Sequence, residues 1–163
     1  KKLLFPIETL PVNLVMSGIV SGLFALLVFI AAVLIARGTI PMSAAWLPVV
    51  LIPQILLTMG LCWWLAATGV FFRDLGQIIG FVLTLWFFLT PICYPDTSLP
   101  QWALPVLGKN PVYTIVRGYR AVLLENRAPE WQAIWKLWLL ALAVSIGGYA
   151  WFAKVRRRFA DVL

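Results

Sequence analysis

Four long apolar stretches, separated by short polar segments, dominate the pattern of residues along the chain. None of them contains a charged residue, and the three longest are Val12–Ala36, Gly38–Phe72 and Leu75–Pro95. A fourth, Leu137–Ala153, is only slightly shorter. A helix needs about 20 consecutive apolar residues to cross the hydrocarbon core of a bilayer. The pattern therefore predicts an all-α integral membrane protein with about four transmembrane helices.

The spans are predicted over 12–36, 47–72, 78–94 and 131–153, within a single transmembrane domain that covers 1–163. Pro48 and Pro53 fall in the first turns of the second span, and proline is tolerated in membrane helices where neighbours satisfy the freed backbone groups. Small residues recur at four-residue spacing on one face of the first span and indicate a close helix–helix contact, either between subunits or inside one bundle.

The stretch before the last span is rich in proline, which excludes a continuous helix. Its five prolines are Pro91, Pro95, Pro100, Pro105 and Pro111. We expect short interfacial or re-entrant helices within 95–130, because the stretch stays apolar. Asn110-Pro111 is a typical helix start, with Asn as the cap and Pro at the first helical position.

The distribution of charged residues predicts which side of the membrane each end and each loop of the chain lies on. Only 12% of residues are charged, against 63% hydrophobic, and the formal net charge is +7. The basic residues lie mainly at span ends, so retention at the cytoplasmic face explains them better than nucleic-acid binding does. Lys1, Lys2, Arg73 and the Lys154–Arg158 cluster fall on one side. Both ends of the chain are therefore expected in the cytoplasm, and 95–130 outside it.

Residues that carry catalysis are scarce. The chain has no histidine and two cysteines, so we expect no metal site, no cofactor and no catalytic residue. Gly108-Lys109 lacks the upstream glycine and the following Ser or Thr of a nucleotide-binding loop. Arg73 and Asp74 interrupt the apolar run between the second and third spans, and we predict that they pair at a structural, cytoplasmic turn.

Two segments resemble the permeases of ABC-2-type exporters. KKLLFPIETLPV, just before a span, is similar to the cytoplasmic coupling segment of that family. FFRDLGQIIGFVLTLWFFLTPICYP resembles an Arg-Asp turn leading into a span that ends in a Thr-Pro-Ile-x-Tyr pattern. The residues that carry this second likeness are Arg73, Asp74, Thr90, Pro91, Ile92 and Tyr94. The likeness points to the branch that exports O-antigen, capsule or teichoic acid polysaccharides.

The resemblance implies a bacterial inner-membrane permease that works as a homodimer, with ATP hydrolysis on a separate nucleotide-binding subunit. The coupling segment would be 1–11, with Phe5, Pro6 and Glu8 contacting the ATPase. Such permeases have two further spans before the coupling segment, so we expect this chain to be the carboxy-terminal two-thirds of one. The substrate would be a polysaccharide, still joined to its lipid carrier.

Aromatic and basic residues are the candidates for contact with a sugar chain. Trp63, Trp86 and Tyr94 could stack on the C–H faces of sugars; the alternative for each ring is packing in the core or against lipid. Neighbours on a helix point about 100° apart, so only one of Trp63 and Trp64 can face a path, and we favour Trp63. Arg117 and Arg120 could meet a diphosphate or acidic sugars; the alternative is anchoring to lipid headgroups.

Three other functions remain open at this stage. The chain could belong to an ABC-2 permease for a drug or a small lipid, which the surrounding genes would distinguish. It could be a membrane-embedded enzyme acting on lipid-linked sugars, although the predicted spans lack the acids and histidines such an enzyme needs. It could also be a structural membrane subunit, which co-purification of an ATPase would exclude.

Overall fold

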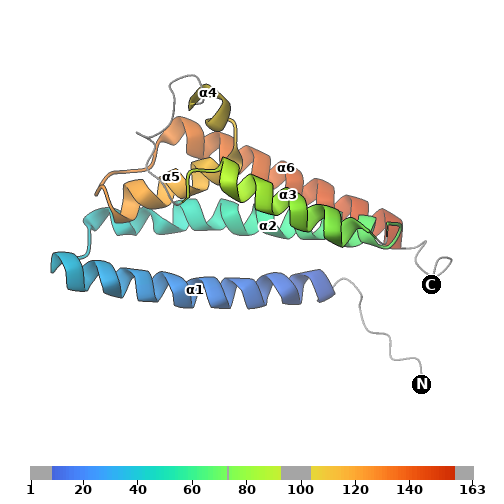
Figure 1. Cartoon of the computed structure of the whole chain (residues 1–163), viewed down its shortest axis with the longest axis horizontal. Coiled ribbons are helices and arrows are strands. Elements are labelled where there is room, and N and C mark those ends of the chain that lie inside the picture. The colour runs from blue at the N-terminus through green and yellow to red at the C-terminus, as the bar shows by residue number, and fades with distance from the viewer. Residues whose placement is uncertain (1–8, 73, 93–103, 157–163) are drawn as a thin grey trace.

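The computed structural model describes residues 9–72, 74–92 and 104–156, and this part of the chain is helical with no strand (Figure 1). The elements are, in order, α1 (Thr9–Arg37), η1 (Met42–Trp46), α2 (Leu47–Gly69), α3 (Leu75–Leu89), α4 (Leu104–Leu107), α5 (Pro111–Leu123) and α6 (Trp131–Val155). Three helical stretches are long and apolar enough to cross a membrane: Pro11–Arg37, Met42–Gly69 and Trp131–Val155. α3 is apolar but has 15 residues. The predicted all-α membrane fold is confirmed.

The centre of the fold is the pair formed by α2 and α6, whose backbones touch where glycines replace side chains. A Cβ atom added at Gly60 of α2 would lie 2.6 Å from the backbone nitrogen of Ser145 on α6. A Cβ added at Gly148 would collide with the carbonyl oxygen of Gly60. Since lipid provides no hydrophobic drive between helices, close backbone approach through small residues is a main source of their association.

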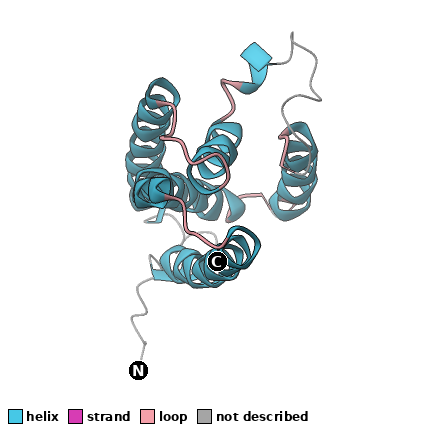
Figure 2. Ribbon diagram, turned by 90° about the vertical axis from the view of Figure 1, so that its left-hand side faces the viewer, coloured by secondary structure: helices cyan, strands magenta, loops and turns pink. Residues whose placement is uncertain are grey.

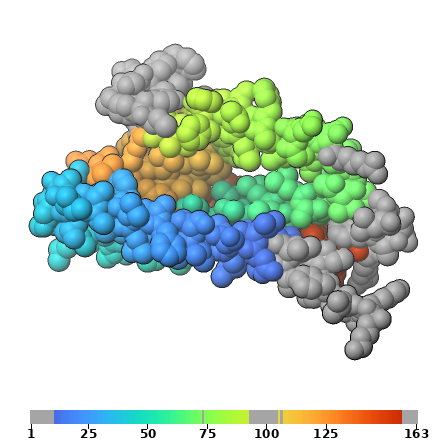
Figure 3. All heavy atoms as spheres, turned by 60° about the horizontal axis from the view of Figure 1, so that its bottom comes forward, coloured from blue at the N-terminus to red at the C-terminus, as the bar shows by residue number. Residues whose placement is uncertain are grey.

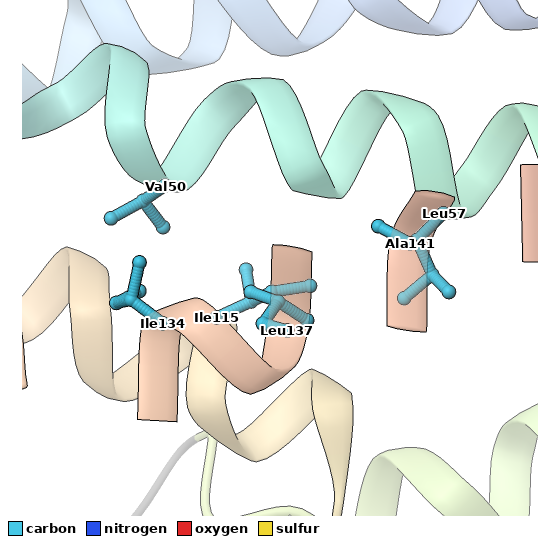
Figure 4. Packing of buried hydrophobic residues seen from close by; sticks show 6 residues of the cluster. All are labelled: Val50, Leu57, Ile115, Ile134, Leu137 and Ala141. Atoms are coloured by element: carbon cyan, nitrogen blue, oxygen red, sulfur yellow. The ribbon is translucent and has the colours of Figure 1, made fainter. Parts of the chain in front are cut away.

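Two apolar clusters extend this contact along the helices. The first joins α2, α5 and α6, and Figure 4 shows its buried members: Val50, Leu57, Ile115, Ile134, Leu137 and Ala141. The second lies toward the end of α6 and contains Ala67, Phe152 and Val155. α5 thus packs on the α2–α6 pair near the start of α6, and Gly118 of α5 lies against Val50.

A proline inside α2 is compensated by a side chain of α6. Pro53 has no N–H, so the carbonyl of Val49, four residues earlier, loses its helical donor. The indole Nε1 of Trp138 donates a hydrogen bond to this carbonyl oxygen over 3.1 Å. The expectation that a neighbour satisfies the group freed by the proline is confirmed.

α1 and α3 stand away from this core. Figure 3 shows α1 (blue) along one edge and α3 (yellow-green) along the other, with α2 and α5 between them. Most described side chains of α1 are exposed, and α3 has no buried residue. Figure 2 also shows α3 apart from the other helices. The start of α1, the α2–α3 turn and the end of α6 lie at one end of the molecule (Figure 1).

Candidate functional site

α5 connects the separated helices, and its capping residue makes the first connection. The Oδ1 atom of Asn110 accepts hydrogen bonds from the backbone N–H of Val112 and from the indole Nε1 of Trp86 on α3, each over 3.0 Å. Its Nδ2 donates to the Oγ1 of Thr90, also over 3.0 Å. Thr90 is buried, with 1% of its surface exposed. The predicted helix start at Asn110-Pro111 is confirmed, and the same amide fixes the end of α3.

The middle of α5 is tied to α2 and to the segment after α3. The Tyr119 hydroxyl donates to the Oε1 of Gln54 on α2 over 2.6 Å. Burial raises the pKa of the Tyr119 hydroxyl, because the charged phenolate loses hydration. The group therefore stays protonated at neutral pH and remains a donor. The Nη2 of Arg120 donates to the carbonyl oxygen of Ile92 over 3.0 Å.

The end of α5 is tied to the connection between α1 and α2. The Oγ of Ser43 in η1 donates to the carbonyl oxygen of Val122 and lies 3.0 Å from the Oδ1 of Asn126, which accepts the backbone N–H of Ser43. Arg37, at the end of α1, donates to the carbonyl oxygen of Leu124 over 2.6 Å. Asn126 has φ 52°, a left-handed conformation that Asn tolerates better than most residues. Through these bonds α5 and the turn after it hold α1, η1, α2 and α3 in one arrangement.

A groove of about 620 Å³ lies between α1, α2 and α5. It is mainly apolar, and its polar lining groups include Gln54, Thr58 and Tyr119. Gly18 and Gly22 line it from α1, and a Cβ added at either would meet nothing within 4 Å. Within the described part of the chain these two small residues therefore face open space and make no close helix contact.

Trp63 and Trp64 both contact α6, although they point in different directions from α2. Trp63 meets Tyr149 edge to face, with ring centroids 5.2 Å apart, and packs against the cluster of Ala67 and Phe152. Its indole Nε1 is buried and has no hydrogen-bond partner among the described atoms. Trp64 stacks on Trp151 at 5.8 Å. The two helices approach so closely that adjacent residues both reach the partner. The role of Trp63 in a substrate path stays a prediction.

The remaining predicted residues are spread over the fold. Trp86 is half-buried and binds Asn110, while Phe87 and Phe88 beside it are exposed. Arg117 is exposed near the start of α6, whereas the guanidinium of Arg120 is turned toward the end of α3. The Asp74 carbonyl accepts the N–H groups of Gln77 and Ile78 at the start of α3. Five predicted residues lie outside the described residues: Phe5, Pro6, Glu8, Arg73 and Tyr94.

Two polar pairs were missed by sequence reasoning. Gln54 is an amide within an apolar span, and polar groups at such positions are usually paired and often functional. That signal identifies Gln54, but its partner Tyr119 is 65 residues away. Ser43 and Asn126 lie in short connections whose composition gives no sign of pairing.

The long apolar helices and the polar ties between them define a multi-pass helical membrane protein. The family model described as ABC-2 type transporter matches residues 1–124, so the chain belongs to the ABC-2 type transporter family. The resemblance found in the two sequence segments is thereby confirmed.

Curated relatives match the chain along nearly its whole length. It is 29% identical to an O-antigen export system permease protein RfbA of Myxococcus xanthus, over 98% of the chain and 62% of the relative. Two proteins of the same name from Klebsiella pneumoniae are 29% and 26% identical over 100% of the chain and 63% of their own length. The chain therefore spans somewhat less than two-thirds of the length of these relatives.

Proposed function

We propose that the chain forms part of the permease subunit of an ABC exporter that moves polysaccharide, joined to a lipid carrier, across the bacterial cytoplasmic membrane. The observation that carries the proposal is the match of nearly the whole chain to three O-antigen export permeases. Membership of the ABC-2 family and the apolar helices support the role of a membrane subunit.

In this proposal ATP is hydrolysed on a separate nucleotide-binding subunit. The chain lacks a nucleotide-binding loop in its sequence, and the printed name of the relatives refers to an export system with a permease protein. The ATPase contacts the coupling segment 1–11 through Phe5, Pro6 and Glu8. A homodimer of permeases, embedded in membrane lipid, encloses the path of the polymer.

The arrangement of the helices supports an orientation with both ends of the chain in the cytoplasm. The start of α1, the α2–α3 turn and the end of α6 lie together (Figure 1), and Lys154 and Arg156 mark this end as basic. Loops rich in Lys and Arg stay in the cytoplasm. The Arg73–Asp74 pair then forms a structural turn on the cytoplasmic side, and α5 lies toward the outer face.

The proposed contacts with the polymer follow from the same orientation. Trp63, Trp86 and Tyr94 provide stacking surfaces along the path, and Arg117 and Arg120 supply positive charge near its outer end. Since Trp86 also binds Asn110, its ring would be held in one orientation toward a passing sugar.

A deletion and complementation experiment tests the proposal. The gene that encodes the chain is deleted, and whole-cell polysaccharide is separated by electrophoresis before and after surface labelling. We expect polymer to disappear from the cell surface and to accumulate inside the cell, where the surface label does not reach it. A plasmid copy of the gene should restore the surface polymer. Normal surface polymer in the deletion strain would refute the proposal, and a changed resistance to drugs in that strain would favour a different substrate.

A further inference from the structure

A second cavity lies between α5 and the start of α6, apart from the groove described above. Its volume is about 350 Å³, and it shares no lining residue with that groove. Its charged lining residues come from α5, from the loop that follows it and from the residue before α6: Arg117, Glu125, Arg127 and Glu130. We refer to this cavity as the α5–α6 pocket.

The α5–α6 pocket combines a charged rim with an apolar floor. Gly118, Ala121, Ala133 and Ile134 line it and have no polar side-chain atoms. Tyr113 lies beside them and is 8% exposed. The small residues among them, Gly118, Ala121 and Ala133, take up little of the space between the two helices.

The rim carries two guanidinium groups and two carboxylates, so its formal charges cancel. A simple anion or cation gains little electrostatic binding energy from such a rim, because each group that attracts the ion has a group of the opposite charge near it that repels the ion. Arginine only donates hydrogen bonds and an ionised carboxylate only accepts them. A ligand with adjacent hydroxyl groups satisfies both, because each hydroxyl donates and accepts. The apolar floor suits the C–H face of a ring.

We propose that the α5–α6 pocket binds a sugar unit of the exported polymer on the outer side of the membrane. The proposal rests on the proposed function for the choice of a sugar over other hydroxylated ligands. It assigns to Arg127 and Glu130 the hydrogen bonds to the hydroxyl groups, at a site separate from the aromatic residues considered for the path. A cavity of this size matches the small end of ligand sites in proteins.

Saturation-transfer NMR on the protein from the full gene, purified in detergent, tests this site. The probes are methyl α-D-mannopyranoside, methyl β-D-galactopyranoside, methyl α-L-rhamnopyranoside and N-acetyl-D-glucosamine, with phosphocholine as a lipid-headgroup probe. Glu130→Ala and Arg127→Ala each remove a rim group. The Glu130 side chain makes no capping hydrogen bond, so α6 keeps its start. Ala128→Trp fills the mouth from an exposed loop position, and Lys136→Ala on α6 lies outside the pocket lining and is the control.

At least one glycoside is expected to bind, with affinity reduced about tenfold by each rim variant and by Ala128→Trp, since a hydrogen bond to a charged group is worth about that factor. Lys136→Ala should bind as the unmodified protein does. Absence of glycoside binding, binding unchanged in all three variants, or binding of phosphocholine alone would each overturn the site. Surface polymer is measured in the same strains. If the polymer is exported but no glycoside binds, only the proposal for the α5–α6 pocket is refuted. If a glycoside binds but deletion of the gene leaves surface polymer intact, only the proposed export function is refuted.

Discussion

The indole N–H of Trp138 on α6 occupies the place of the backbone donor that Pro53 removes from α2, by bonding to the carbonyl oxygen of Val49 over 3.1 Å. A side chain of one helix thus completes the hydrogen bonding of another. This matters most in a bilayer, where water does not reach an unpaired carbonyl.

Trp138→Phe should therefore destabilise the fold by about 1 kcal/mol, because the Val49 carbonyl loses its donor. In a Pro53→Ala background the new backbone N–H can bond to Val49, so the same substitution should cost much less. Unfolding in mixed micelles with increasing dodecyl sulfate, followed by circular dichroism, measures both differences. An equal cost in the two backgrounds would show that Trp138 contributes by packing alone.

Substitution of the glycines between α2 and α6 should have the largest effect on the fold. Gly60→Ala places a Cβ 2.6 Å from the backbone of Ser145, and the helices must separate to accept it. We expect a loss of about 1–3 kcal/mol, the usual cost of overpacking. Gly80→Ala is the matched control, since a Cβ there meets nothing within 4 Å and alanine favours the helix. Similar unfolding curves for the two variants would contradict the close contact.

Asn110 should control the order of both α5 and the end of α3. Asn110→Ala removes the cap, worth about 1 kcal/mol, and also the partner of the Trp86 indole. Asn110→Asp keeps the acceptor for both but loses the donation to Thr90. The rate of amide hydrogen exchange in α5 should therefore be lowest in the wild type, higher in Asn110→Asp and highest in Asn110→Ala. Lys109→Ala serves as the neighbouring control, and equal exchange in all four proteins would refute the role of Asn110.

The sequence predicts those parts of this fold that depend on local chemistry or on the bilayer. The apolar runs identify the long helices because the membrane requires them, and Asn110-Pro111 identifies the start of α5 because capping is local. The pairing of α2 with α6 could not be predicted, since Gly60 and Gly148 are 88 positions apart and look like ordinary helical glycines. A separation of 65 residues likewise conceals the hydrogen bond between Gln54 and Tyr119.

In the candidate site, too, local features could be predicted from the sequence, whereas contacts between distant segments could not. A helical-wheel projection of α2 predicts that the side chains of Trp63 and Trp64 point in different directions. It cannot show that α6 is close enough for both side chains to contact it. Arg117 and Arg120 share a three-residue spacing, yet neighbouring elements decide their surroundings. Arg120 binds the carbonyl of Ile92, while Arg117 lies beside the start of α6.

The proposed coupling segment makes a prediction of its own. Phe5→Asp should abolish transport-coupled ATP hydrolysis while the permease remains in the membrane, because a charge replaces the apolar contact with the ATPase. Phe5→Leu keeps an apolar side chain and should retain most of the coupling. The ATPase rate of the purified complex, with and without substrate, measures the effect. Normal coupling in the Asp variant would remove Phe5 from the contact.

ATP-driven movement of polymer in inverted membrane vesicles tests the central claim most directly. The vesicles contain the permease and its ATPase, and radiolabelled lipid-linked polysaccharide is supplied on the outer, formerly cytoplasmic, face. The account predicts that ATP makes the polymer inaccessible to an added glycosidase, and that a non-hydrolysable ATP analogue does not. Polymer that stays fully accessible after ATP addition, in vesicles whose ATPase is active, would contradict the account.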